Sequence, residues 1–489
     1  MKPINIPLGG RFYRSGSLPI SAQECVNLYM NIPQTIAPTK ENLYVTPGIT
    51  EATTSGSSIN RGAHVFQDMA YVVNGSKLYR IDQSLGGGGT TYSAVDVSGS
   101  GSIAGSAQVI MSDNGAEGGQ ICIVCPDVTS TFNTYIYTVA GGVVTVSDSD
   151  FLGPALTVDY VDGYFLFTKQ NSQTFFISNL RDGLAYTATD FGSAEADPDI
   201  IVGGYILHNE PYIFGSETFE PFQNIGGSGF PFQRVAGGVQ RKGLKSKYAV
   251  VQVNDVLYFL GGAANEKPAI YATDGGRPQK ISTTAIENEI AGYSDSSIST
   301  CFTWNYSDSG HEFIAFNFPN QACFVYDLST NEWATRESKD TNGMPIPYRV
   351  SAVIDAYGVL LVGDRINNSV GILEKDTYTE YGVNIARRFV TPQIDNEGQP
   401  FWIDALELWG ESGVGLTDGT SADVQMSMST NGGRSFNNAL TRNMGAIGAY
   451  NHRTIWNSLG RVSREVCFKF TMSAPVKWVF GKIEAQIEA

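Results

Sequence analysis

The feature that most constrains the fold is a hairpin pattern that recurs along most of the chain. Residues 69–73 are mostly apolar, a turn dipeptide follows at Asn74-Gly75, and a second run with apolar positions covers residues 77–81. An Asn-Gly pair between two such runs predicts a tight β-hairpin. The same arrangement recurs in four further segments, at residues 157–178, 248–272, 298–336 and 349–374.

These units follow one another at intervals of about 40 to 50 residues, a period that is typical of the blades of a β-propeller. Residues 257–260 are apolar throughout and suit a strand buried on both faces, whereas residues 324–328 alternate and suit an outer strand. We expect six or seven blades between about residues 60 and 380. A Gly-rich insert at residues 86–89 and the loop at residues 217–238 obscure the count.

The two ends of the chain lack this period. Residues 1–45 contain five prolines and little apolar periodicity, so we expect an extended N-terminal arm laid on other surfaces. Residues 402–409 and 466–472 alternate between apolar and polar side chains, which is typical of an antiparallel β-sandwich. The predicted all-β organisation is an arm at residues 1–45, a propeller at 46–382 and a C-terminal sandwich at 383–489.

The net charge of the chain restricts the classes of function that it can have. The chain carries 32 Lys and Arg residues against 48 Asp and Glu residues, a net charge of −16. Tight DNA binding needs a positive excess, because phosphate neutralisation supplies most of its affinity. No apolar run reaches the roughly 20 residues that cross a bilayer, and the opening residues lack the apolar segment of a signal peptide. We therefore expect a protein made in the cytoplasm, without a membrane anchor and without tight binding to DNA.

Cysteine and histidine, which often form catalytic or metal sites, are scattered along the sequence. Cys122 and Cys125 lie in an apolar run where their side chains would face opposite sides of a strand, and six cysteines are too sparse for a disulfide framework. The four histidines stand apart from one another and from this pair, which disfavours a zinc site. His311 is expected to hydrogen-bond to a neighbouring blade. We predict no catalytic residue, no metal site and no bound cofactor.

Two motifs need a structural and a functional interpretation side by side. Residues 238–243 approach a phosphate-binding loop, but Leu244 follows where that motif has lysine, and no helix is indicated. The four cations of this segment are interpreted as part of a solvated or partner-facing loop: Arg241, Lys242, Lys245 and Lys247.

Residues 429–436 resemble the Asp-box hairpin of sialidase propellers, with Asn431 in place of the aspartate. In those enzymes the motif is a turn remote from the active site, so a structural role is expected.

A series of short sequence segments, spread over nearly the whole chain, forms a further pattern. They are Cys25-Val26-Asn27-Leu28-Tyr29-Met30, residues 47–49, 61–62, 75–79 and 310–319, Tyr326-Asp327-Leu328-Ser329-Thr330-Asn331-Glu332-Trp333, and residues 363–365, 370–373 and 459–477. Together, and in this order, they resemble the packaged-DNA stabilisation proteins of short-tailed bacteriophages, which are also called tail hub or nozzle proteins.

The resemblance implies a structural protein of the virion. It implies six copies in a ring below the portal and its adaptor ring, closing the DNA exit channel and carrying tail fibres or spikes and a plug or needle. DNA would pass through this ring without sequence-specific binding. An acidic or neutral wall repels the DNA backbone at short range, and salt screens that repulsion beyond roughly 10 Å. The negative net charge suits such a channel.

Assembly into a ring requires contact surfaces, and the chain has 24 Tyr and 26 Phe residues to supply aromatic anchors. In the arm, two cations and two aromatic residues stand together and are predicted to dock on a partner: Arg11, Phe12, Tyr13 and Arg14. Packing of the same residues on the chain's own propeller is the alternative.

Two other functions stay open from the sequence. One is a glycan-binding or sialidase-like, glycan-cleaving tail protein, which would need a pair of carboxylates or an aromatic platform in a pocket. The other is a cellular propeller scaffold unrelated to phage.

Overall fold

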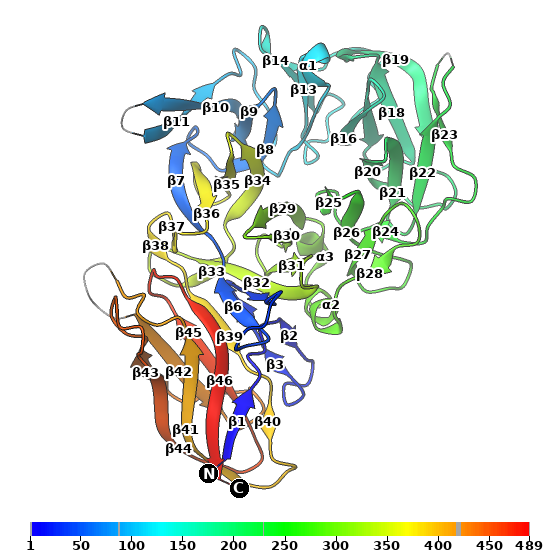
Figure 1. Cartoon of the computed structure of the whole chain (residues 1–489). Helices are drawn as coiled ribbons and strands as arrows, with labels where there is room; N and C mark the ends of the chain where they lie inside the picture. Colours follow the sequence, from blue (N-terminus) through cyan, green and yellow to red (C-terminus); the bar gives the residue numbers. More distant parts are fainter. Residues whose placement is uncertain (1, 87–88, 228, 417–421, 489) are drawn as a thin grey trace.

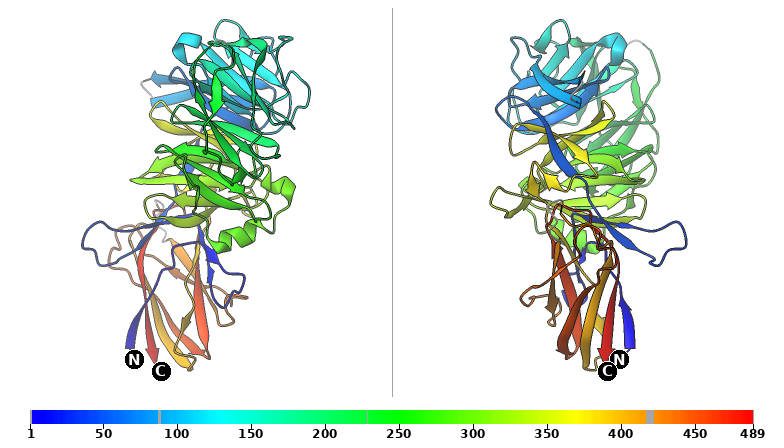
Figure 2. Two further views of the ribbon diagram at one scale, coloured as in Figure 1. Left: turned by 90° about the vertical axis from the view of Figure 1, so that its right-hand side faces the viewer. Right: turned by 60° about the vertical axis from the view of Figure 1, so that its left-hand side comes forward.

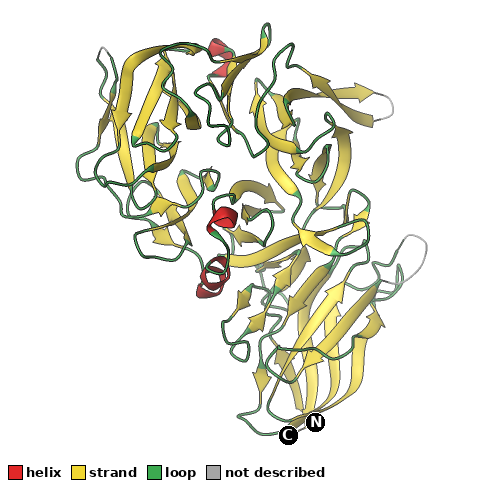
Figure 3. Ribbon diagram, turned by 180° about the vertical axis from the view of Figure 1, so that it is seen from behind, coloured by secondary structure: helices red, strands yellow, loops and turns green. Residues whose placement is uncertain are grey.

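The computed structural model describes residues 2–86, 89–227, 229–416 and 422–488. Almost all of the regular structure is β-strand (Figure 3), and the strands form a wide propeller joined to a narrower sandwich (Figure 1). Both chain ends lie side by side at the end of the sandwich farthest from the propeller (Figure 2), because β1 (Lys2–Ile6) pairs with β46 (Val479–Glu488). Within the predicted Gly-rich insert, Gly87 and Gly88 lie outside the described residues.

Seven sheets formed by described residues stand around a common centre and make up the propeller, so the expected range of six or seven blades resolves to seven. Blade 1 contains β8 (Asn60–Phe66), β9 (Met69–Asn74), β10 (Lys77–Gly86) and β11 (Gly89–Asp96). Blade 2 contains β12 (Ile110–Asp113), β13 (Gln120–Val124), β14 (Thr134–Thr138) and β15 (Gly142–Thr145). Blade 3 contains β16 (Ala155–Val161), β17 (Tyr164–Lys169), β18 (Thr174–Asn179) and β19 (Asp182–Ser193).

The remaining blades follow in sequence order. Blade 4 contains β20 (Ile201–Leu207), β21 (Glu210–Gly215), β22 (Phe219–Asn224) and β23 (Phe232–Arg234). Blade 5 contains β24 (Gly243–Leu244), β25 (Val250–Val253), β26 (Val256–Gly262), β27 (Ala269–Thr273) and β28 (Gln279–Lys280). Blade 6 contains β29 (Phe302–Asp308), β30 (His311–Asn317), β31 (Cys323–Asp327) and β32 (Glu332–Lys339). Blade 7 contains β34 (Val350–Ala356), β35 (Val359–Asp364), β36 (Ser369–Glu374) and β7 (Gly48–Thr54).

The fourth strand of blade 7 comes from the beginning of the chain. β36 pairs antiparallel with β7, from Ser369 opposite Thr54 to Glu374 opposite Gly48. This pairing closes the ring, because the last blade is completed by a segment that precedes the first. Ile49 of β7 is fully buried between blades 6 and 7.

The C-terminal domain is a sandwich of two sheets. One has the order β44-β41-β46-β6-β5, with β1 added on β46, and the other has the order β39-β45-β42-β43, with β40 on β45. Their bounds are β5 (Leu28–Asn31), β6 (Asn42–Val45), β39 (Arg387–Val390), β40 (Ile394–Asp395), β41 (Phe401–Gly410), β42 (Asp423–Ser429), β43 (Leu440–Asn443), β44 (Thr454–Val462) and β45 (Glu465–Met472). The core between the two sheets includes the buried side chains of Trp456 and Phe470.

One sheet continues from the propeller into the sandwich. β4 (Cys25–Val26) pairs parallel with β32 of blade 6 and antiparallel with β39. The resulting sheet has eleven strands. The N-terminal segment is extended, as predicted, but it supplies strands to the sheets of both domains and does not merely lie on them. Its strands of two to five residues are too short to show a period in the sequence. The boundaries placed at residues 45 and 382 stay predictions.

Short elements fill the remaining connections. They are β2 (Tyr13–Arg14), β3 (Ala22–Gln23), β33 (Pro345–Pro347), β37 (Thr379–Glu380), β38 (Val383–Asn384), α1 (Gly115–Gly118), α2 (Thr284–Ile290) and α3 (Asp295–Ile298). The Thr283 side chain caps α2 by accepting a hydrogen bond from the backbone N–H of Ile286. Among the described residues, no helix is long and apolar enough to cross a membrane.

All six cysteines are buried free thiols. Cys122 packs between blades 2 and 3, and Cys125 packs between blades 1 and 2, so the two side chains face opposite sides as predicted. Burial raises the pKa of the Cys125 thiol to about 11, which keeps it protonated at neutral pH.

Truncating the buried side chain of the ring-closing strand tests the role of that strand. We expect Ile49→Ala to lower the free energy of unfolding by about 2–5 kcal/mol, because it leaves a cavity between blades 6 and 7. Ile36→Ala makes the same chemical change at a fully exposed position and is expected to change stability by less than about 0.5 kcal/mol. The urea midpoints of both variants measure the difference, and equal midpoints would show that β7 is dispensable for closure.

Candidate functional site

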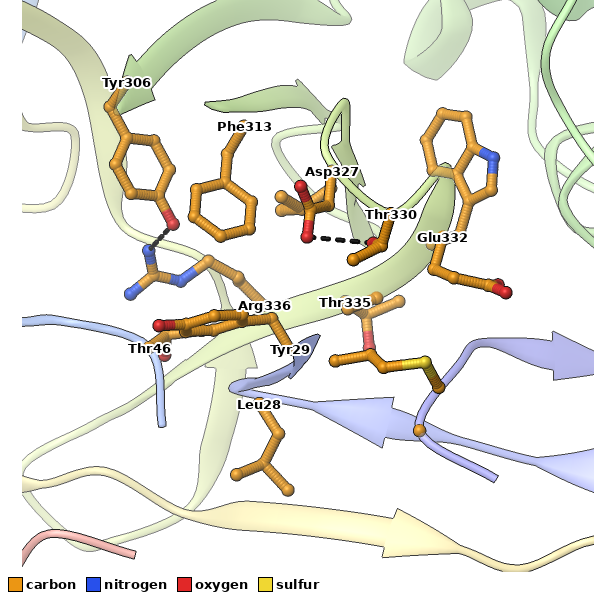
Figure 4. A pocket seen from close by; sticks show the side chains of 15 residues that line it. Leu28, Tyr29, Thr46, Tyr306, Phe313, Asp327, Thr330, Glu332, Thr335 and Arg336 are labelled. Carbon is orange, nitrogen blue, oxygen red and sulfur yellow. Dashed lines mark hydrogen bonds between the residues drawn. The ribbon is translucent and has the colours of Figure 1, made fainter. Parts of the chain in front are cut away.

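The N-terminal segment meets both domains at one place, next to β4. Figure 4 shows this junction from close by: Leu28 and Tyr29 come from the arm, and Phe313, Asp327 and Arg336 come from blade 6. Because the arm, the propeller and the sandwich all meet here, we describe this junction as the candidate functional site.

Asn27 connects three segments of the chain at this junction. Its side-chain amide donates to the carbonyls of Glu337 in blade 6, at 2.9 Å, and of Ala386 before the sandwich, at 2.7 Å. Its side-chain oxygen accepts from the backbone N–H of Glu337 at 3.1 Å, and its own N–H donates to the Thr335 carbonyl at 2.9 Å. Asn27 is fully buried and has a φ of 55°, a conformation that asparagine tolerates better than most residues.

An arginine of the sandwich reinforces the same connection. Arg388 in β39 lies 2.9 Å from the Glu24 carboxylate of the arm and 3.1 Å from the Glu337 carboxylate of blade 6. Burial alone would lower the pKa of Arg388, but the two carboxylates together raise it above its ordinary value. Arg388 therefore stays charged and links the arm, the propeller and the sandwich.

The space between the arm and blade 6 is almost completely filled. The cavity there has a volume of about 10 Å³, which is room for about one water molecule. Its wall includes Arg336, whose guanidinium donates to the Pro47 carbonyl at 2.8 Å and lies 4.5 Å from the centre of the Tyr348 ring. The junction is a packed joint with no room for a substrate or cofactor.

His311 lies at this junction, but with a different partner from the one predicted. Its Nδ1 is 2.7 Å from Asp327 Oδ2 in the same blade, and its Nε2 is 3.1 Å from Asn31 Oδ1 in β5. The prediction of a hydrogen bond to a neighbouring blade was wrong, because the arm occupies that position. Asn31 is 280 residues away in the sequence, so no local pattern indicates this contact.

Of the four arm residues predicted to dock on a partner, Arg11, Phe12, Tyr13 and Arg14, the first three contact the chain's own propeller. Phe12 is 7% exposed, its ring centroid is 5.4 Å from that of Phe324, and its N–H donates to the Trp333 carbonyl at 2.6 Å. This corresponds to the alternative that the sequence left open for Phe12.

The other three side chains of this group make polar contacts within the chain: Arg11 with Glu332 at 3.1 Å, Tyr13 with Thr284 at 3.2 Å and Arg14 with Glu24 at 4.0 Å. The side chains of Arg11 and Arg14 remain 42% and 52% exposed. Their docking on a partner therefore stays a prediction.

Each cation of the basic loop also has a contact within the chain. The contacts are Arg241 with Asp197 at 3.9 Å, Lys242 with Glu266, Lys245 Nζ with the Ser216 carbonyl at 2.9 Å, and Lys247 with the Tyr248 ring at 4.9 Å. These contacts satisfy the charges locally, and Arg241 is still 86% exposed.

The segment that resembles an Asp box forms a tight turn after β42 in the sandwich. Asn431 Oδ1 accepts from the Ser435 N–H at 3.0 Å, and Ser429 Oγ accepts from the Gly433 N–H at 3.0 Å. Gly433 has a φ of 82°, which favours glycine at this point of the turn. The motif shapes the loop, as expected.

In the described ranges, no set of three or more His, Cys, Asp or Glu side chains is arranged so that it could hold a metal ion.

Two family models together match nearly the whole chain. The model described as bacteriophage P22 Gp10, beta-propeller, matches residues 4–378, and the model described as bacteriophage P22 Gp10, beta-sandwich, matches residues 386–488. The chain belongs to the bacteriophage P22 Gp10 family. It is a structural protein of the phage tail and a component of the virion, as the sequence resemblance predicted. The fold class is also confirmed, since members of this family combine a propeller with a C-terminal sandwich.

Other comparisons add only distant likenesses. No curated protein matches the chain. The computationally designed Ika8 protein is 10% identical, with 66% of this chain and 99% of that chain covered and a TM-score of 0.37. The N-terminal domain of Nup159 is 11% identical, with 70% and 98% covered and a TM-score of 0.38. PorZ of Porphyromonas gingivalis is 11% identical, with 68% and 38% covered and a TM-score of 0.38. Similarities at this level carry no argument about function.

Substitutions at Asn27 test the junction. We expect Asn27→Ala to lower the free energy of unfolding by about 3 kcal/mol or more, because it leaves buried backbone groups without partners and puts alanine, which tolerates a positive φ less well than asparagine, at this position. Asn27→Gly loses the same hydrogen bonds without the backbone strain, so its cost should be about 1 kcal/mol smaller. Urea denaturation of both variants measures these costs.

Asn171 is the matched control, since it has a φ of 52° in an exposed turn. Asn171→Ala should cost only the strain, about 1–2 kcal/mol. If Asn27→Ala and Asn171→Ala destabilise the protein equally, the hydrogen bonds of Asn27 do not hold the junction.

Proposed function

We propose that this family member forms the hub, or nozzle, of the tail: a ring of six copies below the portal and its adaptor ring. The ring closes and conducts the DNA exit channel and attaches tail fibres or spikes and the plug or needle. The single observation that carries the proposal is the match of the two Gp10 models over residues 4–378 and 386–488. Synthesis in the host cytoplasm precedes its incorporation into the virion.

The continuous sheet through β4 supports this role mechanically. A subunit that closes a channel against packaged DNA must keep its two domains in a fixed relation under load. Backbone hydrogen bonds from β32 to β4 and from β4 to β39 run through the junction without interruption. Side-chain bonds from Asn27 and Arg388 add to them. Such a subunit transmits force as one body.

Exposed apolar side chains supply contact points for partners. The most exposed large ones are Ile36, Leu85, Tyr450 and Ile20, at 102%, 79%, 74% and 72% exposure. Ile20, Ile36 and Tyr450 lie in separate loops and turns, and Leu85 lies near the end of β10, so the four are spread over the surface. This spread suits contacts with several neighbouring proteins in an assembly. The exposed guanidinium groups of Arg11 and Arg14 form part of one such surface in this proposal.

The charge of the chain supports a channel that DNA passes without adhering. A net charge of −16 per copy gives a ring of six a strong negative field. Repulsion between this field and the DNA phosphates acts within about 10 Å at physiological salt. Retention of DNA then depends on a constriction or plug.

Reconstitution with the portal and adaptor proteins of the same phage tests the proposal. We expect sedimentation and electron microscopy to show a six-fold ring of this protein below the adaptor, with Asp and Glu in excess on the channel wall. Arg11→Ala combined with Arg14→Ala should weaken the ring, whereas Arg241→Ala, at another exposed cation, should not. A strict monomer at every concentration, even with both partners present, would contradict the hub role.

A further inference from the structure

The outer face of the sandwich carries two exposed tryptophans on one strand. Trp402 and Trp409 of β41 are 47% and 43% exposed. A regular strand would place residues seven positions apart on opposite faces, but a register shift between Ile403 and Ala405 brings both rings to the outer face. Side chains of this size are rarely left in water on the same face without a partner.

Trp409 packs closely against β46. Its ring lies over Gly481 of β46: a Cβ at that position would be 2.3 Å from Trp409 Cζ3 and 2.6 Å from Cε3. Lys482 Nζ lies over the same indole, 6.0 Å from the ring centre, and the remaining part of the ring is exposed. Trp402 is fixed by Arg461, whose guanidinium lies 5.5 Å from the ring centre.

One groove is lined by Trp409, and a second hollow lies at Gly481, the residue on which Trp409 packs. A groove of about 410 Å³ extends from Trp409 to the loop at residues 444–453 and is also lined by the highly exposed Tyr450. A second hollow, of about 360 Å³, lies against Gly481 and Lys482. Both volumes fall within the range of about 300–1,000 Å³ that is typical of small-molecule sites.

Arg453 in the groove and Lys482 in the second hollow each form an ion pair. Arg453 Nε lies 2.8 Å from Glu407 Oε1, and Lys482 Nζ lies 2.6 Å from Glu484 Oε1. The hydrogen bond from Arg453 lowers the pKa of Glu407, so this carboxylate is ionised and accepts hydrogen bonds at neutral pH. The surface thus offers fixed donors and acceptors with little net charge, which favours a neutral, hydroxyl-rich ligand.

We propose that this face binds a neutral oligosaccharide, with Trp409 and Tyr450 stacked on the apolar faces of pyranose rings and Glu407 and Arg453 hydrogen-bonded to hydroxyl groups. A pyranose has an apolar C–H face and a polar rim, and the groove offers an aromatic plane beside polar pairs. Trp402 does not line this groove, so the proposed contacts centre on Trp409 and Tyr450. The site does not depend on the tail-hub role.

Saturation-transfer NMR on the full chain tests the proposal, with neutral hexasaccharides of glucose, galactose and mannose as probes. We expect transfer to the ring protons of at least one probe, and a loss of affinity of about tenfold or more in Trp409→Ala, a change of about 1.4 kcal/mol. Trp409→Phe should keep much of the binding, because it retains an aromatic ring over Gly481. Phe191→Ala, at a propeller residue that is 47% exposed, should leave the affinity unchanged.

Three results would overturn the proposal. The first is no transfer from any probe at about 10 mM, where a site with a Kd of about 1 mM is already largely occupied. The second is tighter binding of an anionic polysaccharide such as heparin than of the neutral probes. The third is a change in the oligomeric state of the protein in Trp409→Ala without any sugar signal, which would assign the face to protein contacts.

Discussion

The rest of the structure depends on the pairing of β4 with two domains at once. This two-residue strand has blade 6 on one edge and the sandwich on the other, and Asn27 directly after it bonds to backbone groups of both sides. Pulling the domains apart would expose these buried groups without partners, and each such group costs about 1–3 kcal/mol. The same N-terminal path of the chain also places β7, which closes the propeller ring, and the sandwich strands β1, β5 and β6.

Local sequence patterns were sufficient where each strand pairs with its neighbour in the chain. The turn at Asn74-Gly75 and the apolar run at residues 257–260 predicted blades that the structure contains. The patterns were insufficient where pairing partners are far apart. Val26 pairs with Thr335 and Arg388, and Ile49 pairs with Leu373, so neither contact has a local signal. Asn27 was visible only as one polar residue in an apolar run, which indicates a special backbone position without naming its partners.

The sandwich shows a second limit of sequence reasoning. Residues 402–409 were interpreted as a regular alternating strand, but the shift between Ile403 and Ala405 changes which side chains share a face. Simple alternation separates Trp402 from Trp409, whereas the structure places both outside. The aromatic face and its paired charges therefore emerge only from the register. A protein whose domains are locked together by the arm can keep such a face in a fixed position for a partner.

Native-state hydrogen exchange of the full chain tests most directly the claim that the arm, propeller and sandwich form one mechanical unit. The amide of Asn27 and the other amides of residues 25–30 should exchange as slowly as the core amides of β31 and β45, because they open only when both domains unfold. The exposed loop at residues 32–41 provides a fast-exchanging internal reference. Fast exchange of residues 25–30, while β31 and β45 stay protected, would show that the arm detaches on its own and would contradict the account.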